Sequence, residues 1–152
     1  MAAQGYGIDG FALNLGSDEW QPNRIADAYA AAAAIAANDT NKPPFKLFLS
    51  FDMTCLSDPG LINTYIRQYH GHVSQFVFEG KDFVSTFSGE YVTFGQPTAN
   101  DGWQVMVKDV LAAEGIFIYF VPQWSAFPPA GVFESQPVID GMLCWTAWFF
   151  LL

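Results

Sequence analysis

The sequence predicts an α/β fold that forms part of a (β/α)8 TIM barrel, with about five βα units and parallel strands. Short apolar segments alternate with helical segments along the 152 residues, and this alternation implies parallel pairing with right-handed crossovers. Apolar residues make up 51% of the chain and charged residues 14%, as in a packed globular protein. Residues 14–17 (NLGS) lack the glycine-rich phosphate loop that usually follows the first strand of an open nucleotide-binding sheet, which favours the barrel.

The first two strands are expected at residues 7–14 and 45–52, with an alanine-rich helix between them. The first strand is apolar on both faces, which is typical of parallel strands covered by helices. Pro22 begins the helix at a position where its missing N–H costs nothing, and alanine is the strongest helix former. Alternation in the second strand places Ser50 and Asp52 on one face, which therefore becomes polar as the strand ends.

The later elements continue the alternation of helices and strands. Asp58 is the expected cap of a helix that has Pro59 at its first position. Pro122 should end the fourth strand, because proline has no N–H for a sheet ladder. In chain order, the expected elements are a helix at 58–71, a third strand formed by 73–78, by 82–87 or by both in a bulged arrangement, a helix capped by Asn100 or Asp101 that ends at Gly115, a strand at 116–121 and a fifth strand that includes 143–148.

Charge and targeting signals limit the partners of the chain. Six basic and fifteen acidic residues give a net charge of -9, which repels phosphate backbones and anionic lipids, so no nucleic acid and no membrane partner is expected. The apolar run at 142–152 is shorter than the ~20 residues that span a bilayer, and the residues after Met1 do not lead us to expect a signal peptide. Cys55 and Cys144 are too few for a metal cluster, so we expect no metal, and we favour two buried thiols over a Cys55–Cys144 bridge.

Polar and aromatic residues gather at the expected carboxyl ends of the strands, where the active sites of barrels lie. Flat aromatic rings stack on the C–H faces of sugars, and carboxylates and amides form hydrogen bonds with sugar hydroxyls, so this combination predicts a sugar site. A tryptophan in a strand is nevertheless more often part of the core. The candidate residues are Asn14, Asp52, Glu90, Trp124, Trp145 and Trp148.

Other titratable residues are expected to have structural roles. His70 and His72 stand at the end of a helix, where a cation suits the helix dipole. Asp82 lies close to Gly80 and beside Lys81, and it is expected in a solvated turn.

Five ordered segments, each at an expected strand, resemble a known family. Together they cover nearly the whole chain, and five motifs in order are more specific than any one of them. The chain resembles glycoside hydrolase family 71, the fungal mutanases or endo-α-1,3-glucanases. The segments are residues 7–14 (GIDGFALN), 45–53 (FKLFLSFDM), 80–90 (GKDFVSTFSGE), 120–124 (FVPQW) and 140–145 (DGMLCW).

The resemblance implies a secreted or cell-wall protein that hydrolyses α-1,3-glucan, a neutral polysaccharide, on a (β/α)8 barrel without a metal or organic cofactor. Members of the family are thought to invert, with an acid and a base ~6.5–9.5 Å apart. The Trp-Asn-Asp-Tyr-Gly-Glu-like motif that we associate with this pair is absent from the chain, so the catalytic residues are unknown. Asp52 and Glu90 are the candidate carboxylates, and with Asn14 they are expected to position the substrate.

The same resemblance predicts that residues 1–152 are an incomplete catalytic barrel without its N-terminal strand and its C-terminal units. Family members begin with a strand and a helix before the segment at 7–14, and their barrel continues beyond Trp148. Two alternatives stay open. One is a non-catalytic glucan-binding fragment, and the other is an unrelated open α/β domain that binds a small anionic ligand after Asn14.

Overall fold

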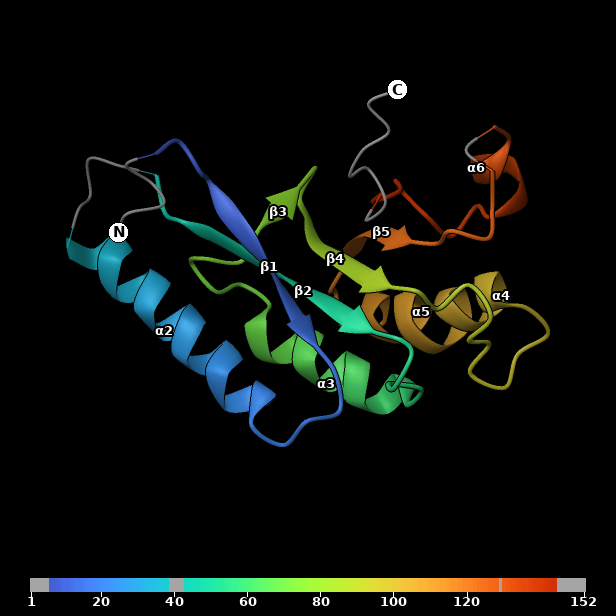
Figure 1. The fold of residues 1–152 in the computed structure, drawn as a ribbon, viewed down its shortest axis with the longest axis horizontal. Coiled ribbons are helices and arrows are strands. Elements are labelled where there is room, and N and C mark those ends of the chain that lie inside the picture. The colour runs from blue at the N-terminus through green and yellow to red at the C-terminus, as the bar shows by residue number, and fades with distance from the viewer. Residues whose placement is uncertain (1–5, 39–42, 129, 145–152) are drawn as a thin grey trace, which may run out of the picture.

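Parallel strands form the centre of the fold (Figure 1). The computed structural model describes residues 6–38, 43–128 and 130–144. Within them, the parallel strands lie in the order in which the chain reaches them, and each pairs with the parallel strand before it. They are β1 (Gly10–Leu15), β2 (Lys46–Asp52), β4 (Lys81–Phe87) and β5 (Ile118–Gln123).

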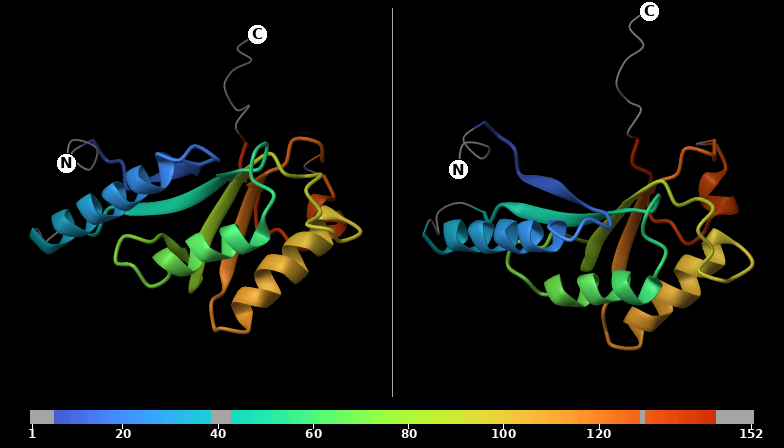
Figure 2. Two further views of the ribbon diagram at one scale, coloured as in Figure 1. Left: turned by 90° about the horizontal axis from the view of Figure 1, so that it is seen from below. Right: turned by 60° about the horizontal axis from the view of Figure 1, so that its bottom comes forward.

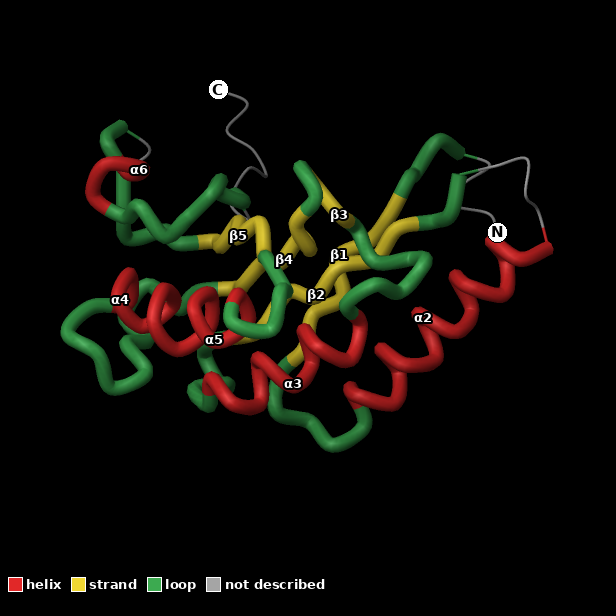
Figure 3. Tube along the Cα trace, turned by 180° about the vertical axis from the view of Figure 1, so that it is seen from behind, coloured by secondary structure: helices red, strands yellow, loops and turns green. Residues whose placement is uncertain are grey.

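The main helices cover the same face of this sheet (Figure 2) and follow one another along it (Figure 3). A doubly wound sheet would carry helices on both faces and reverse its strand order. Helices on one face and an unreversed order are the arrangement of a (β/α)8 barrel. The α/β fold is therefore confirmed, and its winding agrees with the predicted barrel. The helices are α2 (Gln21–Asn38), α3 (Pro59–Tyr69), a continuous helix of α4 (Ala99–Trp103), the π-helical η1 (Gln104–Lys108) and α5 (Asp109–Ala112), and a short α6 (Val132–Ser135).

The face of the sheet beneath the helices is apolar. Leu49 and Phe51 of β2 and Phe120 of β5 are almost fully buried there. Trp103 of α4 stacks on Phe120, with their ring centroids 4.1 Å apart. Burial of large apolar side chains is the main favourable contribution to folding. The apolar residues of each strand therefore face the helices, and the residues that alternate with them face away.

The opposite face of the sheet carries aromatic rings first and polar groups toward the strand ends. Phe48, Phe83 and Tyr119 form one row across β2, β4 and β5. The ring centroids of Phe48 and Phe83 lie 4.7 Å apart, and those of Phe83 and Tyr119 lie 6.0 Å apart. Ser50 and Asp52 follow Phe48 on this face of β2, as the alternation of the sequence predicts.

The third predicted strand is a hairpin, not a bulged strand. The short β3 (Val77–Phe78) pairs antiparallel with the start of β4. Glu79 and Gly80 connect the two strands with φ angles of 50° and 76°. Positive φ at both positions is what a two-residue hairpin turn of type I′ requires. Both predicted segments contribute, but the second provides the main strand and the first only a short edge.

The strand β5 continues through Pro122, so the prediction that this proline ends the strand is wrong. The backbone N–H groups of Asp140 and Leu143 donate to the carbonyls of Phe120 and Pro122 at 2.8 and 3.0 Å. The nitrogen of Pro122 points to the same side as its carbonyl, away from β4, so the ladder with β4 needs no N–H from it. Residues 140–144 follow β5 here without forming a strand, and the rest of the predicted fifth strand lies outside the described residues.

Two helix caps test the predicted helix starts. Asp58 accepts a backbone N–H of the first turn at 2.8 Å and Pro59 begins α3, as predicted. The helix α4 begins after Thr98, whose hydroxyl accepts the N–H of Asp101, so the predicted cap at Asn100 or Asp101 is wrong. Asp101 lies in the first turn instead, where a negative charge suits the helix dipole.

Candidate functional site

Three strand ends meet at the carboxyl edge of the sheet. The N–H of Met53, directly after β2, donates to the carbonyl of Phe87 at the end of β4, with N and O 3.0 Å apart. A Cβ at Gly89 would lie 2.7 Å from Met53 Cγ and 3.6 Å from Trp124 Nε1, and the φ of Gly89 is 103°. Only glycine tolerates both this conformation and this crowding. The absence of a side chain at Gly89 therefore allows the ends of β2, β4 and β5 to lie close together.

Asp52 is the last residue of β2, on the face that the helices leave open. Its Oδ1 accepts the backbone N–H of Thr54 at 3.1 Å and the Thr54 hydroxyl at 2.6 Å. These two bonds form a local turn that holds the carboxylate in one orientation. Its Oδ2 forms no hydrogen bond within the described part of the chain, so this oxygen can accept hydrogen bonds from a ligand.

Glu90 follows β4, one residue beyond the crowded Gly89. The Ser125 hydroxyl donates to Glu90 Oε1 at 3.4 Å, across from the loop that follows β5. The N–H of Ser88 donates to the side-chain oxygen of Gln123, the last residue of β5, at 3.1 Å. Asp52 and Glu90 thus come from neighbouring strand ends on either side of the contact between Met53 and Gly89.

Asn14 is exposed near the end of β1. The strand β2, which carries Asp52, lies between β1 and β4, so Asn14 is one strand farther from Glu90 than Asp52 is. The register pairs Asn14 with Ser50 on the open face. Ser50 is fully buried and its hydroxyl has no hydrogen-bond partner among the described residues. The candidate polar groups therefore form a row from Asn14 to Glu90 along the carboxyl edge.

The tryptophan candidates differ in what the structure says of them. Trp124 is fully buried, with ring centroids 5.8 Å from Phe120 and 5.9 Å from Phe127. In this position it supports the strand end from beneath, and its indole N–H has no partner within the described residues. Stacking of Trp124 on a sugar stays a prediction. Trp145 and Trp148 lie outside the described residues.

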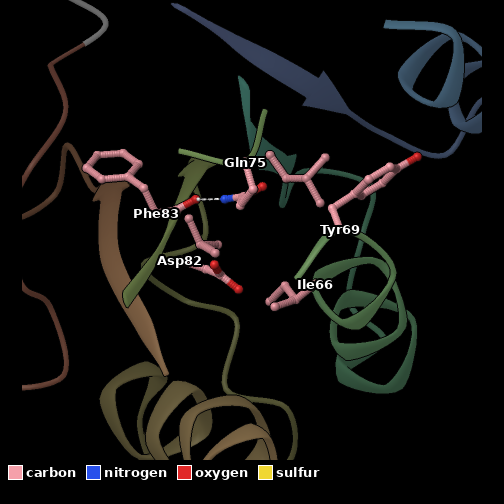
Figure 4. Close-up of a pocket in the computed structure, with 7 residues that line it drawn as sticks. Ile66, Tyr69, Gln75, Asp82 and Phe83 are labelled. Carbon is pink, nitrogen blue, oxygen red and sulfur yellow. Dashed lines mark hydrogen bonds between the residues drawn. The ribbon is translucent and has the colours of Figure 1, made fainter. Parts of the chain in front are cut away.

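A second polar cluster lies at the other end of the sheet, around a hollow of only about 10 Å³ between α3 and the strands (Figure 4). Asp82 is expected in a solvated turn, but it is only 4% exposed. Its Oδ2 forms a hydrogen bond with His70 Nδ1, with the two atoms 2.7 Å apart. The Tyr29 hydroxyl donates to Gln75 Oε1 at 2.6 Å, and Gln75 Nε2 donates to the carbonyl of Phe83 at 3.3 Å. The sequence expectation for Asp82 is therefore wrong, because the hairpin turn ends before it and β4 carries it under α3.

Burial perturbs the titration of this second cluster. Desolvation raises the pKa of Asp82, although the hydrogen bond with His70 acts in the opposite direction. Desolvation also raises the pKa of Tyr29, with a further contribution from Tyr69. Perturbed pKa values often mark functional sites, but structural networks perturb them too. A hollow of this size has no room for a sugar, so we assign this cluster to stability.

The cysteines do not occupy the core. Cys55 and Cys144 are both exposed, so the expected burial of their thiols is wrong. Cys55 lies in the loop after β2, where the chain leaves the sheet. Among the described residues, no group of three His, Cys, Asp or Glu side chains could hold a metal ion. In the same part of the chain, no helix is long and apolar enough to cross a membrane.

The fold and the site together define a class of protein. It is an α/β protein wound as a barrel is, with carboxylates gathered at the carboxyl ends of its strands. Residues 1–150 match Glycosyl hydrolase family 71, and the chain belongs to this family.

Relatives with names agree with the family. Glucan endo-1,3-alpha-glucosidase agn1 of Schizosaccharomyces pombe is 48% identical over 143 residues, which are 93% of this chain and 32% of that protein. Ascus wall endo-1,3-alpha-glucanase of the same organism is 34% identical over 93% of this chain, and a mutanase of Penicillium rubens is 31% identical over 96% of it. The chain spans about a third of the length of these relatives, 32% of each. No solved structure matches it.

Proposed function

We propose that this chain is the substrate-binding part of an enzyme that cleaves α-1,3-glucan internally. Membership in Glycosyl hydrolase family 71 carries the proposal, together with relatives that are named for endo-hydrolysis of 1,3-α-glucan. Those relatives are about three times as long as the part that matches. The activity of the whole enzyme is therefore proposed for the longer protein, and glucan binding for this chain.

The carboxyl edge supplies the chemistry that a neutral polysaccharide requires. Asp52 has an oxygen that no described residue engages, and Glu90 and Asn14 present a carboxylate and an amide on the same edge. Such groups form hydrogen bonds with sugar hydroxyls. The net charge of -9 disfavours anionic ligands and leaves a neutral glucan acceptable. We assign Asn14, Asp52 and Glu90 to substrate positioning.

Cleavage by inversion needs two carboxyl groups with different protonation states. One donates a proton to the leaving oxygen, and the other activates water on the opposite face of the sugar. We place this pair outside the 152 residues, because the acid-and-base motif expected for the family is absent from the sequence. The chain then positions the glucan while the rest of the barrel provides the acid and base. A secreted or cell-wall location fits a substrate of this kind.

Co-sedimentation with particulate glucan tests the proposal. The folded chain should pellet with α-1,3-glucan particles and stay in the supernatant with β-1,3-glucan particles of the same mass. A folded chain that stays in the supernatant with both polymers overturns glucan binding. Release of reducing sugar by the chain should be undetectable, and robust release would show that the catalytic pair lies within these 152 residues.

The sequence also allows a second function, that of an open α/β domain that binds a small anionic ligand. Family membership and helices on a single face both argue against it. In the loop after Asn14, the N–H of Gly16 donates to the side-chain oxygen of Gln21. That N–H is therefore already engaged within the chain and is not available to an anion. Glucan binding remains the function that the observations favour.

A further inference from the structure

A pocket of about 300 Å³ opens beside Glu90, at the end of the row of strand-end candidates. It lies between the loop that follows β4 and the segment that follows β5. Its volume is at the lower end of the ~300–1,000 Å³ typical of ligand pockets, enough for a short stretch of a sugar chain. The residues that define its chemistry are Glu90, Tyr91, Thr93, Thr98, Phe127 and Gln136.

Hydrogen bonds join the two walls of this pocket to the sheet and to each other. Ser88 is tied to the side chain of Gln123 at the base of the first wall, with N and O 3.1 Å apart. The N–H of Val138 in the second wall donates to Asn100 Oδ1 of α4 at 2.9 Å. Across the gap, Ser125 donates to Glu90 at 3.4 Å. The pocket is therefore formed before a ligand enters, which reduces the entropic cost of binding.

The lining combines exposed aromatic surface with open polar groups. Tyr91 is 79% exposed although it lies in a loop tied to the sheet, and Phe127 is partly buried against Trp124. Glu90 and Gln136 place a carboxylate and an amide beside these rings. The exposed ring of Tyr91 offers a flat surface on which the C–H face of a pyranose can stack. The adjacent carboxylate accepts hydrogen bonds from sugar hydroxyls and disfavours an anionic ligand.

We infer that this pocket continues the glucan site beyond Glu90 as a further subsite, in which the ring of Tyr91 stacks on one glucose unit and Glu90 and Gln136 bind its hydroxyls. The inference rests on the proposed function and extends it beyond Asn14 and Asp52. It assigns the stacking surface to Tyr91, while the buried Trp124 and the partly buried Phe127 pack against each other on the side of the pocket that follows β5. The subsite holds the polymer and takes no part in bond cleavage.

Titration of the chain with a soluble α-1,3-linked glucooligosaccharide tests the subsite by calorimetry. Tyr91→Ala should raise Kd about tenfold, because it removes the stacking surface, and Tyr91→Phe should keep the affinity of the parent chain. Glu90→Gln should raise Kd about threefold, because the amide keeps the shape of the side chain and loses a charged acceptor. Tyr6→Ala is the matched control, since Tyr6 is 86% exposed at the amino end of β1 and should leave Kd unchanged.

The outcomes separate this subsite from the proposed function. If the parent chain does not bind the oligosaccharide, the proposed function fails, and the subsite fails with it. If the parent chain binds and Tyr91→Ala and Glu90→Gln both bind as tightly, the subsite is overturned and Glu90 loses its assigned role, while glucan binding by the chain stands. A loss of affinity in Tyr91→Phe equal to that in Tyr91→Ala would also overturn stacking. Unchanged thermal melting of each variant shows that the fold is intact.

Discussion

The two ends of the strands use the same kind of side chain in opposite ways. Toward the amino ends, Asp82 is buried against His70, and Asp140 accepts hydrogen bonds from the N–H of Phe120 and from Lys108. At the carboxyl edge, Asp52 is bound only within its own turn. Asp82 and Asp140 are held by partners on other elements and stabilise the fold. Asp52 keeps one oxygen that no described residue engages, and Glu90 accepts only the long 3.4 Å bond from Ser125 among the described residues, so both remain available to a ligand.

The largest expected effect is at Asp82. Asp82→Ala removes a buried carboxylate and leaves His70 without its partner and a void beside the strands. We expect a loss of about 2–3 kcal/mol in the free energy of unfolding, below the full cost for a buried pair because His70 is partly exposed. Urea unfolding measures it. Asp27→Ala, which breaks an exposed pair with Arg24, is the control and should change little.

Asp140 should have the next largest effect, with a graded response to two substitutions. Its Oδ2 accepts the N–H of Phe120 at 2.8 Å and Lys108 Nζ at 2.7 Å, which joins β5 to the π-helical segment. Asp140→Ala loses both bonds and should cost about 2 kcal/mol, whereas Asp140→Asn keeps an acceptor for Phe120 and should cost about 1 kcal/mol. Equal losses in the two variants would mean that the charge, and not the bond to β5, is what matters.

Asp52 should show the reverse behaviour, with a small loss of stability and a clear loss of binding. Asp52→Asn keeps Oδ1 as an acceptor for Thr54, so the free energy of unfolding should fall by less than about 1 kcal/mol. The loss of a charged acceptor should raise Kd for an α-1,3-linked oligosaccharide by about fivefold. Calorimetry and urea unfolding on one preparation give both numbers. If Asp52→Asn unfolds as readily as Asp82→Ala, the contrast between the two edges is wrong.

Local patterns in the sequence predict much of this fold. The alternation in β2 and the Asp58–Pro59 start of α3 depend on neighbours in the chain, and the structure agrees with both. The resemblance of the strand-end motifs leads to the family that the comparison confirms. It also places Asp52 and Glu90 at the edge where parallel strands end together.

Features that depend on distant partners could not be predicted in this way. The burial of Asp82 requires the hairpin to end at Gly80 and His70 to lie opposite, and neither is visible as a pattern. The π-helical segment also depends on a distant partner, because Asn63 Nδ2 of α3 donates to the carbonyl of Met106 at 2.9 Å. Tyr91 directly follows the Glu90 motif, but its exposure comes from the path of a loop. Its place as the first aromatic residue after a strand-end motif is the sequence signal for the role that we propose for it.

The smallest expected effect is a change in how stability depends on pH. Burial raises the pKa of Asp82 above its ordinary value of 3.8, so just above that pH the folded chain holds this proton more tightly than the unfolded chain. The stability that this shifted protonation contributes is therefore fully present below pH 3.8 and is lost as pH rises through the folded-state pKa. Asp82→Asn cannot titrate, so the parent chain should lose stability relative to this variant as pH rises above the ordinary pKa of 3.8. Urea unfolding across this range measures the difference, with His70 and Tyr29 as the titratable groups nearest to the carboxyl. A constant difference would show that His70 cancels the effect of burial, and a difference of opposite sign would show that the pair is held as ions.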